Sequence, residues 1–215
     1  MQRTGNQLRA GGRRGNRSRP RRKAGVAAAG LVESLLAECR PGWALPGSFH
    51  SDATVYRADL DRVWRTGWLF AGHTCEIPKP GDYFTLQLDA DPLIVMRGPD
   101  GSLHGLHNVC RHRGSTICHE AAGHVARLVC PYHQWAYGLN GDLLSCRGMH
   151  DLDKTQFGLK QVRVREAGGL IFLSLAADPL SFEPAHELLA PLAKPQGFDR
   201  AKVAKATDYL VKANW

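Results

Sequence analysis

The pattern of hydrophobic and polar positions changes character near residue 67. Before that point two helices are expected, the first over residues 26–39. The second can be capped by Ser51 or Asp52 and is expected to run to about Thr66. After it come short apolar runs separated by turn residues, which are typical of strands. These strands are predicted at 68–71, 83–88, 93–97, 103–109, 125–129, 161–165 and 170–175. The chain is therefore expected to be mainly β, with an antiparallel β-sandwich after N-terminal helices.

Three further segments carry local signals. The dipeptide Asn140-Gly141 predicts a type I′ hairpin turn, because both residues tolerate positive φ. A short helix is expected over 183–192, and a last strand is expected over 204–215.

The basic balance of the chain comes from its first thirty residues. The net charge is +8, with 28 Lys and Arg against 20 Asp and Glu, but residues 1–30 hold nine of the basic residues and no acid. The other 185 residues therefore carry 19 basic and 20 acidic side chains. No argument for nucleic-acid binding follows from the overall charge, and no nucleic-acid partner is expected. Residues 1–25 are rich in Arg and Gly and lack large apolar runs, so this basic tail is expected to be disordered.

Three interpretations of the tail are open. An upstream start codon or an extension without function is the simplest. A twin-arginine export signal would use Arg21-Arg22 and the apolar stretch 24–36, although Glu33 interrupts that stretch. A transit peptide is the third, because the segment is Arg-rich and free of acids. No run approaches the roughly 18–20 apolar residues of a membrane span, so no membrane association is expected.

Two half-sites carry the strongest chemical signal. Cys110-Arg-His112 is followed, after seventeen intervening residues, by Cys130-Pro-Tyr-His133. Each half-site offers one thiolate and one imidazole, which suits a Rieske [2Fe–2S] centre, where two histidines replace two cysteines on one iron. A structural zinc protein is an alternative, but zinc sites more often pair their cysteines in one knuckle and their histidines in another. One [2Fe–2S] cluster per chain is expected, with Cys110 and Cys130 on one iron and His112 and His133 on the other.

Other potential ligands give weaker signals. The segment His119-Glu-Ala-Ala-Gly-His124 resembles the H-E-x-x-H zinc helix, but it has one residue too many and Gly123 weakens a helix. No metal site is expected there. The remaining cysteines are most simply free thiols in a reducing cytosol, so a cytoplasmic location is expected. They are Cys39, Cys75, Cys118 and Cys146.

With their neighbours, the half-sites read Cys110-Arg-His-Arg-Gly114 and Cys130-Pro-Tyr-His-Gln-Trp-Ala-Tyr-Gly138. These boxes resemble the N-terminal domain of Rieske non-haem iron oxygenase α-subunits, and the similarity runs over residues 41–215. Segments 41–46, 64–73 and 80–82 resemble the branch acting on glycine betaine and related quaternary amines. The resemblance implies a Rieske-type fold and a Trp135 that shields the cluster. Gly114 is expected to allow a tight turn in the first loop.

The resemblance also implies an activity. Members of the family are oxidoreductases that use O₂ and NAD(P)H: a flavin or ferredoxin-type reductase feeds the Rieske centre, which feeds a mononuclear Fe(II). By family analogy the full-length protein is a homotrimer. Respiratory Rieske proteins are related but carry an extra cysteine in each box, where this chain has Ser115 and Tyr132. Their bracing disulfide cannot form here, which argues against the respiratory class and against export.

Family members continue beyond an Asn-Trp such as Asn214-Trp215 into a domain with the 2-His-1-carboxylate triad, which nothing before that point supplies. We therefore expect the electron-transfer half of an oxygenase subunit, without catalytic residues or oxygenase activity of its own. A truncated gene, a frameshift or an incomplete record would explain it. The alternative function is a stand-alone Rieske ferredoxin, which would need little more than the core domain. The expected organisation is a tail (1–25), a helical arm (26–66), a Rieske domain (67–178), and a linker with the start of the missing domain (179–215).

Overall fold

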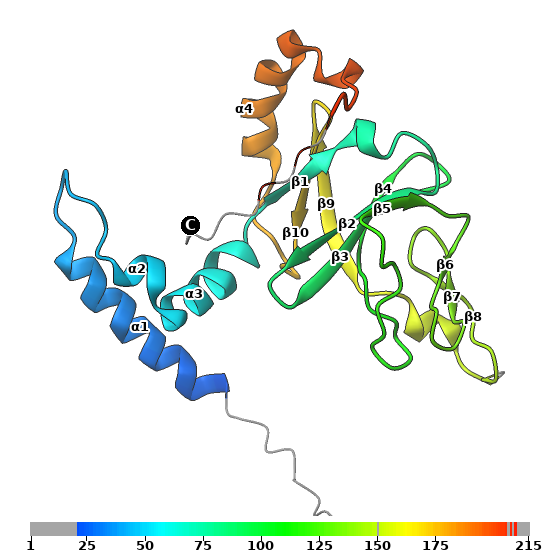
Figure 1. Cartoon of the computed structure of the whole chain (residues 1–215), viewed down its shortest axis with the longest axis horizontal. Helices are drawn as coiled ribbons and strands as arrows, with labels where there is room; N and C mark the ends of the chain where they lie inside the picture. Colours follow the sequence, from blue (N-terminus) through cyan, green and yellow to red (C-terminus); the bar gives the residue numbers. More distant parts are fainter. Residues whose placement is uncertain (1–20, 150, 206, 208, 210–215) are drawn as a thin grey trace, which may run out of the picture. The chain divides into compact units, whose positions relative to one another are not determined.

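The computed structural model of the chain describes residues 21–149, 151–205, 207 and 209. The chain divides between Ala58 and Asp59 into two compact units. The first unit contains the helices α1 (Arg21–Glu38), α2 (Ser48–Ser51) and most of α3 (Ala53–Asp59) (Figure 1). Among the described residues, no helix has the length and apolar character needed to cross a membrane.

The helical arm differs from its prediction at two places. Helix α1 begins at Arg21, so residues 21–25, for which disorder was predicted, are helical; residues 1–20 lie outside the described part. Arg, Lys and Ala have favourable helix propensities, so a segment of this composition can be helical. The second difference is the short helix α2, which precedes the predicted start; Asp52 then has the extended ψ of 124° that is typical of an N-cap, and α3 begins at Ala53. The Asp52 carboxylate accepts a 2.6 Å hydrogen bond from the Thr54 N–H, so its predicted capping role is confirmed. A π-helical turn, Leu60–Trp64, follows α3.

The second unit is built from two antiparallel sheets, which confirms the mainly β prediction (Figure 1). The larger sheet has the strand order β1-β10-β9-β4-β3-β2-β5 and the smaller one the order β6-β7-β8. The strands are β1 (Leu69–His73), β2 (Asp82–Leu88), β3 (Asp91–Arg97), β4 (Leu103–His107), β5 (Ala122–His124), β6 (Leu128–Val129), β7 (Ala136–Tyr137), β8 (Leu143–Ser145), β9 (Gln161–Ala167) and β10 (Leu170–Ser174).

The predictions around the smaller sheet need correction. The strand predicted over 125–129 is wrong, because β5 ends before it and only its last two residues form β6. Asn140-Gly141 is not a type I′ turn, because Asn140 is absent from the non-glycine residues with positive φ. Instead Gly141 has φ +89° and donates to the Gly138 carbonyl, while Gly138 donates to the Asp142 carbonyl. This is the pattern of a three-residue hairpin loop with glycine at the left-handed position.

Beyond β10 the chain forms helix α4 (Glu183–Ala193), which confirms the helix predicted over 183–192. Two 3₁₀ turns follow it, Lys194–Gln196 and Phe198–Arg200. The strand predicted over 204–215 is not seen at residues 204, 205, 207 and 209, and its other residues lie outside the described part.

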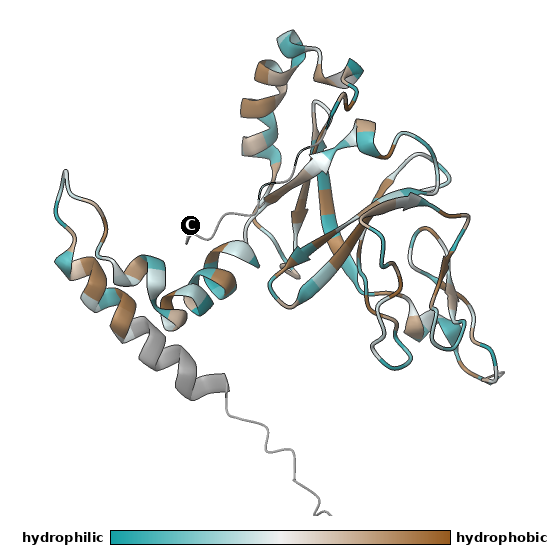
Figure 2. Cartoon of the chain, viewed as in Figure 1, coloured by the Kyte–Doolittle hydropathy of each residue, from teal (hydrophilic) through white to brown (hydrophobic). Residues whose placement is uncertain are grey.

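Strand β3 has both of its faces buried, and its side chains contribute to two apolar clusters. Leu93 and Val95 face one apolar cluster, formed with residues of β2, β9 and β10. Ile94 and Met96 alternate with them and face a second cluster. That second cluster extends through the smaller sheet to the cysteines of the two half-sites. Figure 2 shows the hydrophobic residues concentrated along the strands.

Candidate metal centre

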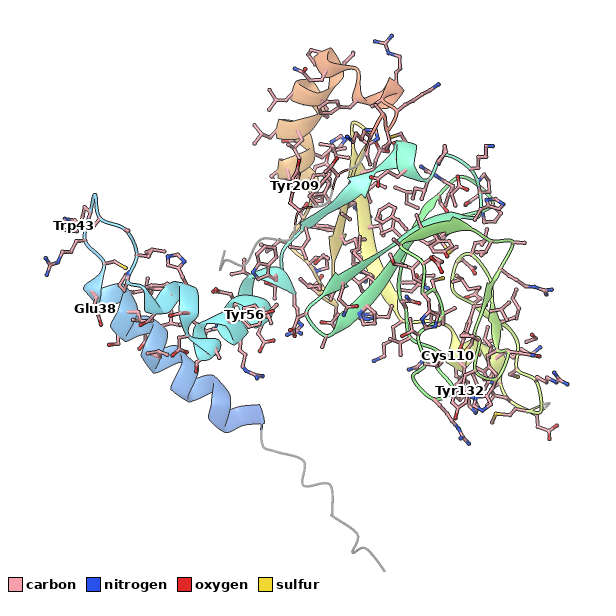
Figure 3. All side chains as sticks on the ribbon, viewed as in Figure 1. Glu38, Trp43, Tyr56, Cys110, Tyr132 and Tyr209 are labelled. Carbon is pink, nitrogen blue, oxygen red and sulfur yellow. The ribbon has the colours of Figure 1, made fainter. Side chains whose placement is uncertain are left out.

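Two loops at one end of the smaller sheet carry the predicted ligands. The first loop, residues 108–121, connects β4 to β5 and contains Cys110 and His112. The second loop, residues 130–135, connects β6 to β7 and contains Cys130 and His133. Figure 3 shows Cys110 of the first loop and Tyr132 of the second loop together at this end of the molecule.

The two loops have the same backbone design. In the first, the Cys110 N–H donates to the Ser115 carbonyl (2.8 Å) and the Gly114 N–H donates to the Cys110 carbonyl (2.9 Å). In the second, the Cys130 N–H donates to the Trp135 carbonyl (2.8 Å) and the Gln134 N–H donates to the Cys130 carbonyl (3.0 Å). Each loop is thus closed by two hydrogen bonds to its own cysteine.

The fourth residue after each cysteine has a left-handed backbone. Gly114 has φ +74°, a conformation that glycine adopts without steric cost. The corresponding residue of the second loop is Gln134, with φ +60°, which is unusual for a residue with a Cβ atom. The Gln134 side chain carbonyl accepts a 2.8 Å hydrogen bond from the Arg147 guanidinium. Sequence reasoning gave no role to Gln134 or Arg147.

The structure brings all four predicted ligands together. Cys110 and Cys130 are 2% and 1% exposed, and the half-buried His112 and His133 rings have their centroids 4.6 Å apart. The Nδ1 atom of each histidine is buried and has no hydrogen-bond partner. Buried polar atoms are rarely left unpaired, so the two Nδ1 atoms are suited to coordinating a metal. A pair of thiols and a pair of imidazoles match the donor set of a Rieske [2Fe–2S] cluster.

A mononuclear metal fits less well. Within the described part of the chain, no three His, Cys, Asp or Glu side chains gather as they would around a single ion. A structural zinc needs four such ligands in a tetrahedron. The segment with His119 and His124 offers no alternative: His119 is exposed, and the His124 ring lies 2.8 Å from the Asp82 carboxylate.

Tyr137 is a buried polar neighbour of a candidate ligand. It is fully buried, its hydroxyl lies 3.2 Å from the Cys110 sulfur, and the same oxygen accepts a 3.0 Å hydrogen bond from the Arg111 N–H. Burial raises the pKa of Tyr137 far above its ordinary value, so the hydroxyl keeps its proton. With Arg111 as its donor, the Tyr137 oxygen can direct that proton at the Cys110 sulfur.

Trp135 covers one side of the histidine pair. Its ring, 1% exposed, stacks on His112 with centroids 4.9 Å apart and an interplanar angle of 11°. Phe157 packs edge-on against the other part of the indole at 5.9 Å. Burial, followed by the neighbouring His133 ring and the Arg113 guanidinium, lowers the pKa of His112. The neutral imidazole, which is the form that binds iron, is thereby favoured.

Asn108 holds the two ends of the first loop together. Its side chain, 3% exposed, accepts hydrogen bonds from the N–H groups of Ile117 (3.1 Å) and Cys118 (2.8 Å). Its amide also donates to the Cys118 carbonyl at 2.7 Å. Sequence reasoning missed this residue; an asparagine two positions before a ligand was the only signal.

Comparisons with known proteins agree with this geometry. The family profile described as "Rieske [2Fe-2S] domain" matches residues 67–158. The glycine betaine monooxygenase oxygenase subunit of Pseudomonas aeruginosa (strain UCBPP-PA14) is 43% identical over 175 residues, which are 80% of this chain and 41% of that protein. The large oxygenase component of the naphthalene 1,2-dioxygenase system of Ralstonia sp. is 34% identical over 195 residues, 86% of this chain and 43% of its own.

Solved structures show the same relationship. Naphthalene 1,2-dioxygenase from Rhodococcus sp. bound to indole gives a TM-score of 0.66 at 31% identity, covering 71% of this chain and 36% of that one. The quaternary ammonium Rieske monooxygenase CntA with L-carnitine gives 0.64 at 25% identity, covering 72% and 44%. The chain spans only about two fifths of the curated relatives, 41% for the first of them. The chain therefore carries a Rieske [2Fe–2S] domain of the kind found in the oxygenase subunits of Rieske oxygenases, the family that its two cysteine–histidine boxes predicted.

Proposed function

We propose that this chain is the electron-transfer part of a Rieske oxygenase α-subunit. Cys110 and Cys130 would hold one iron of a single [2Fe–2S] cluster as thiolates, and His112 and His133 would hold the other as neutral imidazoles. The observation that supports this assignment is the pair of buried, unpartnered Nδ1 atoms beside two buried thiols. Trp135 would shield the histidine side, and Gly114 would shape the first loop.

When bound, a Rieske cluster supplies one-electron chemistry at a higher potential than an all-cysteine cluster of the plant ferredoxin type. The residues around the site determine its exposure to water and the hydrogen bonds to its sulfur atoms. Trp135, Phe157 and Tyr137 exclude water from the buried side, and Tyr137 offers a hydrogen bond to the Cys110 sulfur. With Nδ1 of each histidine buried, Nε2 is the nitrogen left to hydrogen-bond a partner group.

For the whole protein we propose an NAD(P)H-dependent oxygenase. A flavin or ferredoxin-type reductase would supply the electrons, and a mononuclear Fe(II) elsewhere in the full-length subunit would activate O₂. A quaternary amine such as glycine betaine is the proposed substrate class. The support is the 43% identity to a glycine betaine monooxygenase oxygenase subunit, against 34–37% to naphthalene dioxygenase large components. A homotrimer and a cytoplasmic location are proposed by family analogy.

A stand-alone Rieske ferredoxin is the competing function. The match to the glycine betaine monooxygenase subunit covers 175 residues, whereas the Rieske domain itself spans residues 67–158. Similarity to an oxygenase subunit thus extends well beyond the cluster domain, which favours the oxygenase function.

The cluster assignment can be tested on the 215-residue chain. Purified without oxygen, it is expected to contain about two irons and two acid-labile sulfides and to give a Rieske-type EPR signal after reduction with dithionite. Cys110→Ser should abolish the signal. Cys146→Ser is the matched control, because Cys146 is also buried but donates to the Met149 carbonyl, and it should keep both irons. Zinc without iron in every preparation would contradict the assignment.

A further inference from the structure

Gln134 keeps an unfavourable backbone conformation in the second ligand loop. Its φ is +60°, in the left-handed region, where a residue with a Cβ atom is strained and glycine is not. Gly114 stands at the same place in the first loop and has φ +74°. The two loops share one backbone design, but only the second builds it on a residue that disfavours it. Contacts elsewhere in the structure must therefore hold Gln134 in place.

The conformation of Gln134 determines where its two neighbours lie. Its N–H closes the loop by donating to the Cys130 carbonyl at 3.0 Å. The candidate ligand His133 precedes it, and Trp135, whose ring stacks on His112, follows it. A change of φ at Gln134 would turn the side chains of His133 and Trp135 relative to each other. The left-handed backbone is therefore a condition for bringing the ligand and its aromatic cover to the same site.

The Gln134 side chain is held by an arginine from outside the loop. Its amide carbonyl accepts a 2.8 Å hydrogen bond from the Arg147 guanidinium, which lies 13 positions further along the chain. The charged donor makes this hydrogen bond stronger than one between neutral groups. Within the part of the chain that the structure describes, Arg147 forms no ion pair, so no carboxylate competes with Gln134 for the guanidinium.

Arg147 is itself placed by a tight turn over residues 146–149. The Met149 N–H donates to the Cys146 carbonyl (3.1 Å), and Gly148 has φ +80°, as at the third position of a type II turn. The Cys146 thiol closes the same turn a second time, because it donates to the Met149 carbonyl at 3.1 Å. Cys146 is 7% exposed and belongs to the apolar cluster that also contains Cys130. The turn thus connects Arg147 to the core of the domain.

We propose that the Arg147–Gln134 hydrogen bond holds the second ligand loop, and with it His133, in the geometry that binds the cofactor. Arg147 and Gln134 are positioning residues: neither is a ligand, and both act through His133 and Trp135. The proposal rests on the cluster assignment made above and goes beyond it. It assigns the shape of the second loop to a side-chain contact that the first loop, with Gly114, does not need.

The test compares the rate of cluster loss among variants of the 215-residue chain that are purified without oxygen. Arg147→Ala and Gln134→Ala both remove the hydrogen bond and leave a Cβ atom at position 134. Each should lose the cluster about threefold faster than the unmodified chain or more, the factor expected from one exposed hydrogen bond. Gln134→Gly removes the bond together with the strain, so its rate should stay within about twofold of the unmodified chain.

The double variant Gln134→Gly/Arg147→Ala separates the hydrogen bond from a general effect of the arginine charge. It should lose the cluster at the rate of Gln134→Gly alone, because glycine leaves no side chain for the arginine to hold. A double variant as labile as Arg147→Ala would overturn the proposal, since the arginine would then act without Gln134. The matched control is Arg127→Ala, which removes the same side chain from an exposed position three residues before Cys130 and should keep the unmodified rate within about twofold.

The EPR spectrum of the reduced chain reports on the geometry of the ligands. Arg147→Ala should shift or broaden the signal, whereas Gln134→Gly and Arg127→Ala should keep the unmodified spectrum. An unchanged spectrum together with an unchanged rate in Arg147→Ala would overturn the proposal and leave the cluster assignment intact. Absence of iron from the unmodified chain would instead refute the cluster assignment. The denaturant midpoints of the same variants, expected in the same order, would then decide whether the hydrogen bond holds the loop.

Discussion

Removal of the Tyr137 hydroxyl should lower the reduction potential of the cluster. In the variant Tyr137→Phe the buried ring is kept, but the hydroxyl 3.2 Å from the Cys110 sulfur is lost. A donor to a cysteine sulfur stabilises the reduced, more negative cluster more than the oxidised one. If that difference is about 1–2 kcal/mol, somewhat less than the roughly 1.5–3 kcal/mol that a whole hydrogen bond to a charged group contributes, the potential falls by about 40–90 mV. The conversion uses 59 mV per tenfold change for one electron.

The same substitution should also cost stability. The Arg111 N–H donates to the Tyr137 oxygen at 3.0 Å and would lose its partner, at a cost of about 1–3 kcal/mol in the free energy of unfolding. Protein-film voltammetry gives the potential, and denaturant unfolding gives the stability. Tyr132→Phe is the matched control, because this tyrosine is 60% exposed and should leave the potential within about 10 mV. A Tyr137→Phe potential equal to or above that of the unmodified protein would refute the proposed hydrogen bond.

Three other predictions concern the potential, the first loop and turnover. The midpoint potential should lie near the low end of the Rieske range, about −150 mV rather than +300 mV, because Ser115 and Tyr132 replace the cysteines of the bracing disulfide that the respiratory class carries. A midpoint above about +100 mV in voltammetry would contradict this. Asn108→Leu should lower the free energy of unfolding by about 3 kcal/mol and speed cluster loss, because three buried hydrogen bonds disappear. Asn108→Asp keeps the two acceptor contacts and should lose less free energy of unfolding in the same denaturant titration. The 215-residue chain alone should accept electrons from a reductant without demethylating glycine betaine, since no three potential ligands gather for a mononuclear iron in the described part. Formaldehyde released in a coupled assay would show a catalytic site that the structure does not reveal.

The parts of the fold that the sequence predicted are those in which a local signal is strong. The long strands β2, β3, β9 and β10 bury alternating or continuous apolar residues, and helix α4 has an amphipathic pattern. The short strands β5 and β7 have three and two residues, so only their partners in the sheet define them. The type I′ turn predicted at Asn140-Gly141 is wrong for a similar reason: the register of the β7–β8 hairpin, and not the local preference of these two residues, determines the loop.

The site shows the same division. The four candidate ligands lie in two compact boxes, so their spacing along the chain is enough to identify them. Their supporting contacts join residues far apart in the sequence: Tyr137 and Cys110 are 27 positions apart, and Arg147 and Gln134 are 13 apart. Such pairs depend on how β7 and β8 place the loops. Asn108 lies near the box, but its partners Ile117 and Cys118 come close only because the first loop folds back.

The closure of each loop by its own backbone has a consequence for cofactor binding. Cys110 and Cys130 each bind the end of their own loop through two hydrogen bonds that involve no side chain and no metal. The shape of each loop backbone is therefore held by contacts other than those of its ligand side chains, unlike small zinc domains that fold only around their ion. Little chain entropy is lost when the cofactor enters, because the ligands are already ordered. The substitution of one ligand side chain should therefore remove its bond to iron and still leave the backbone of the loop closed.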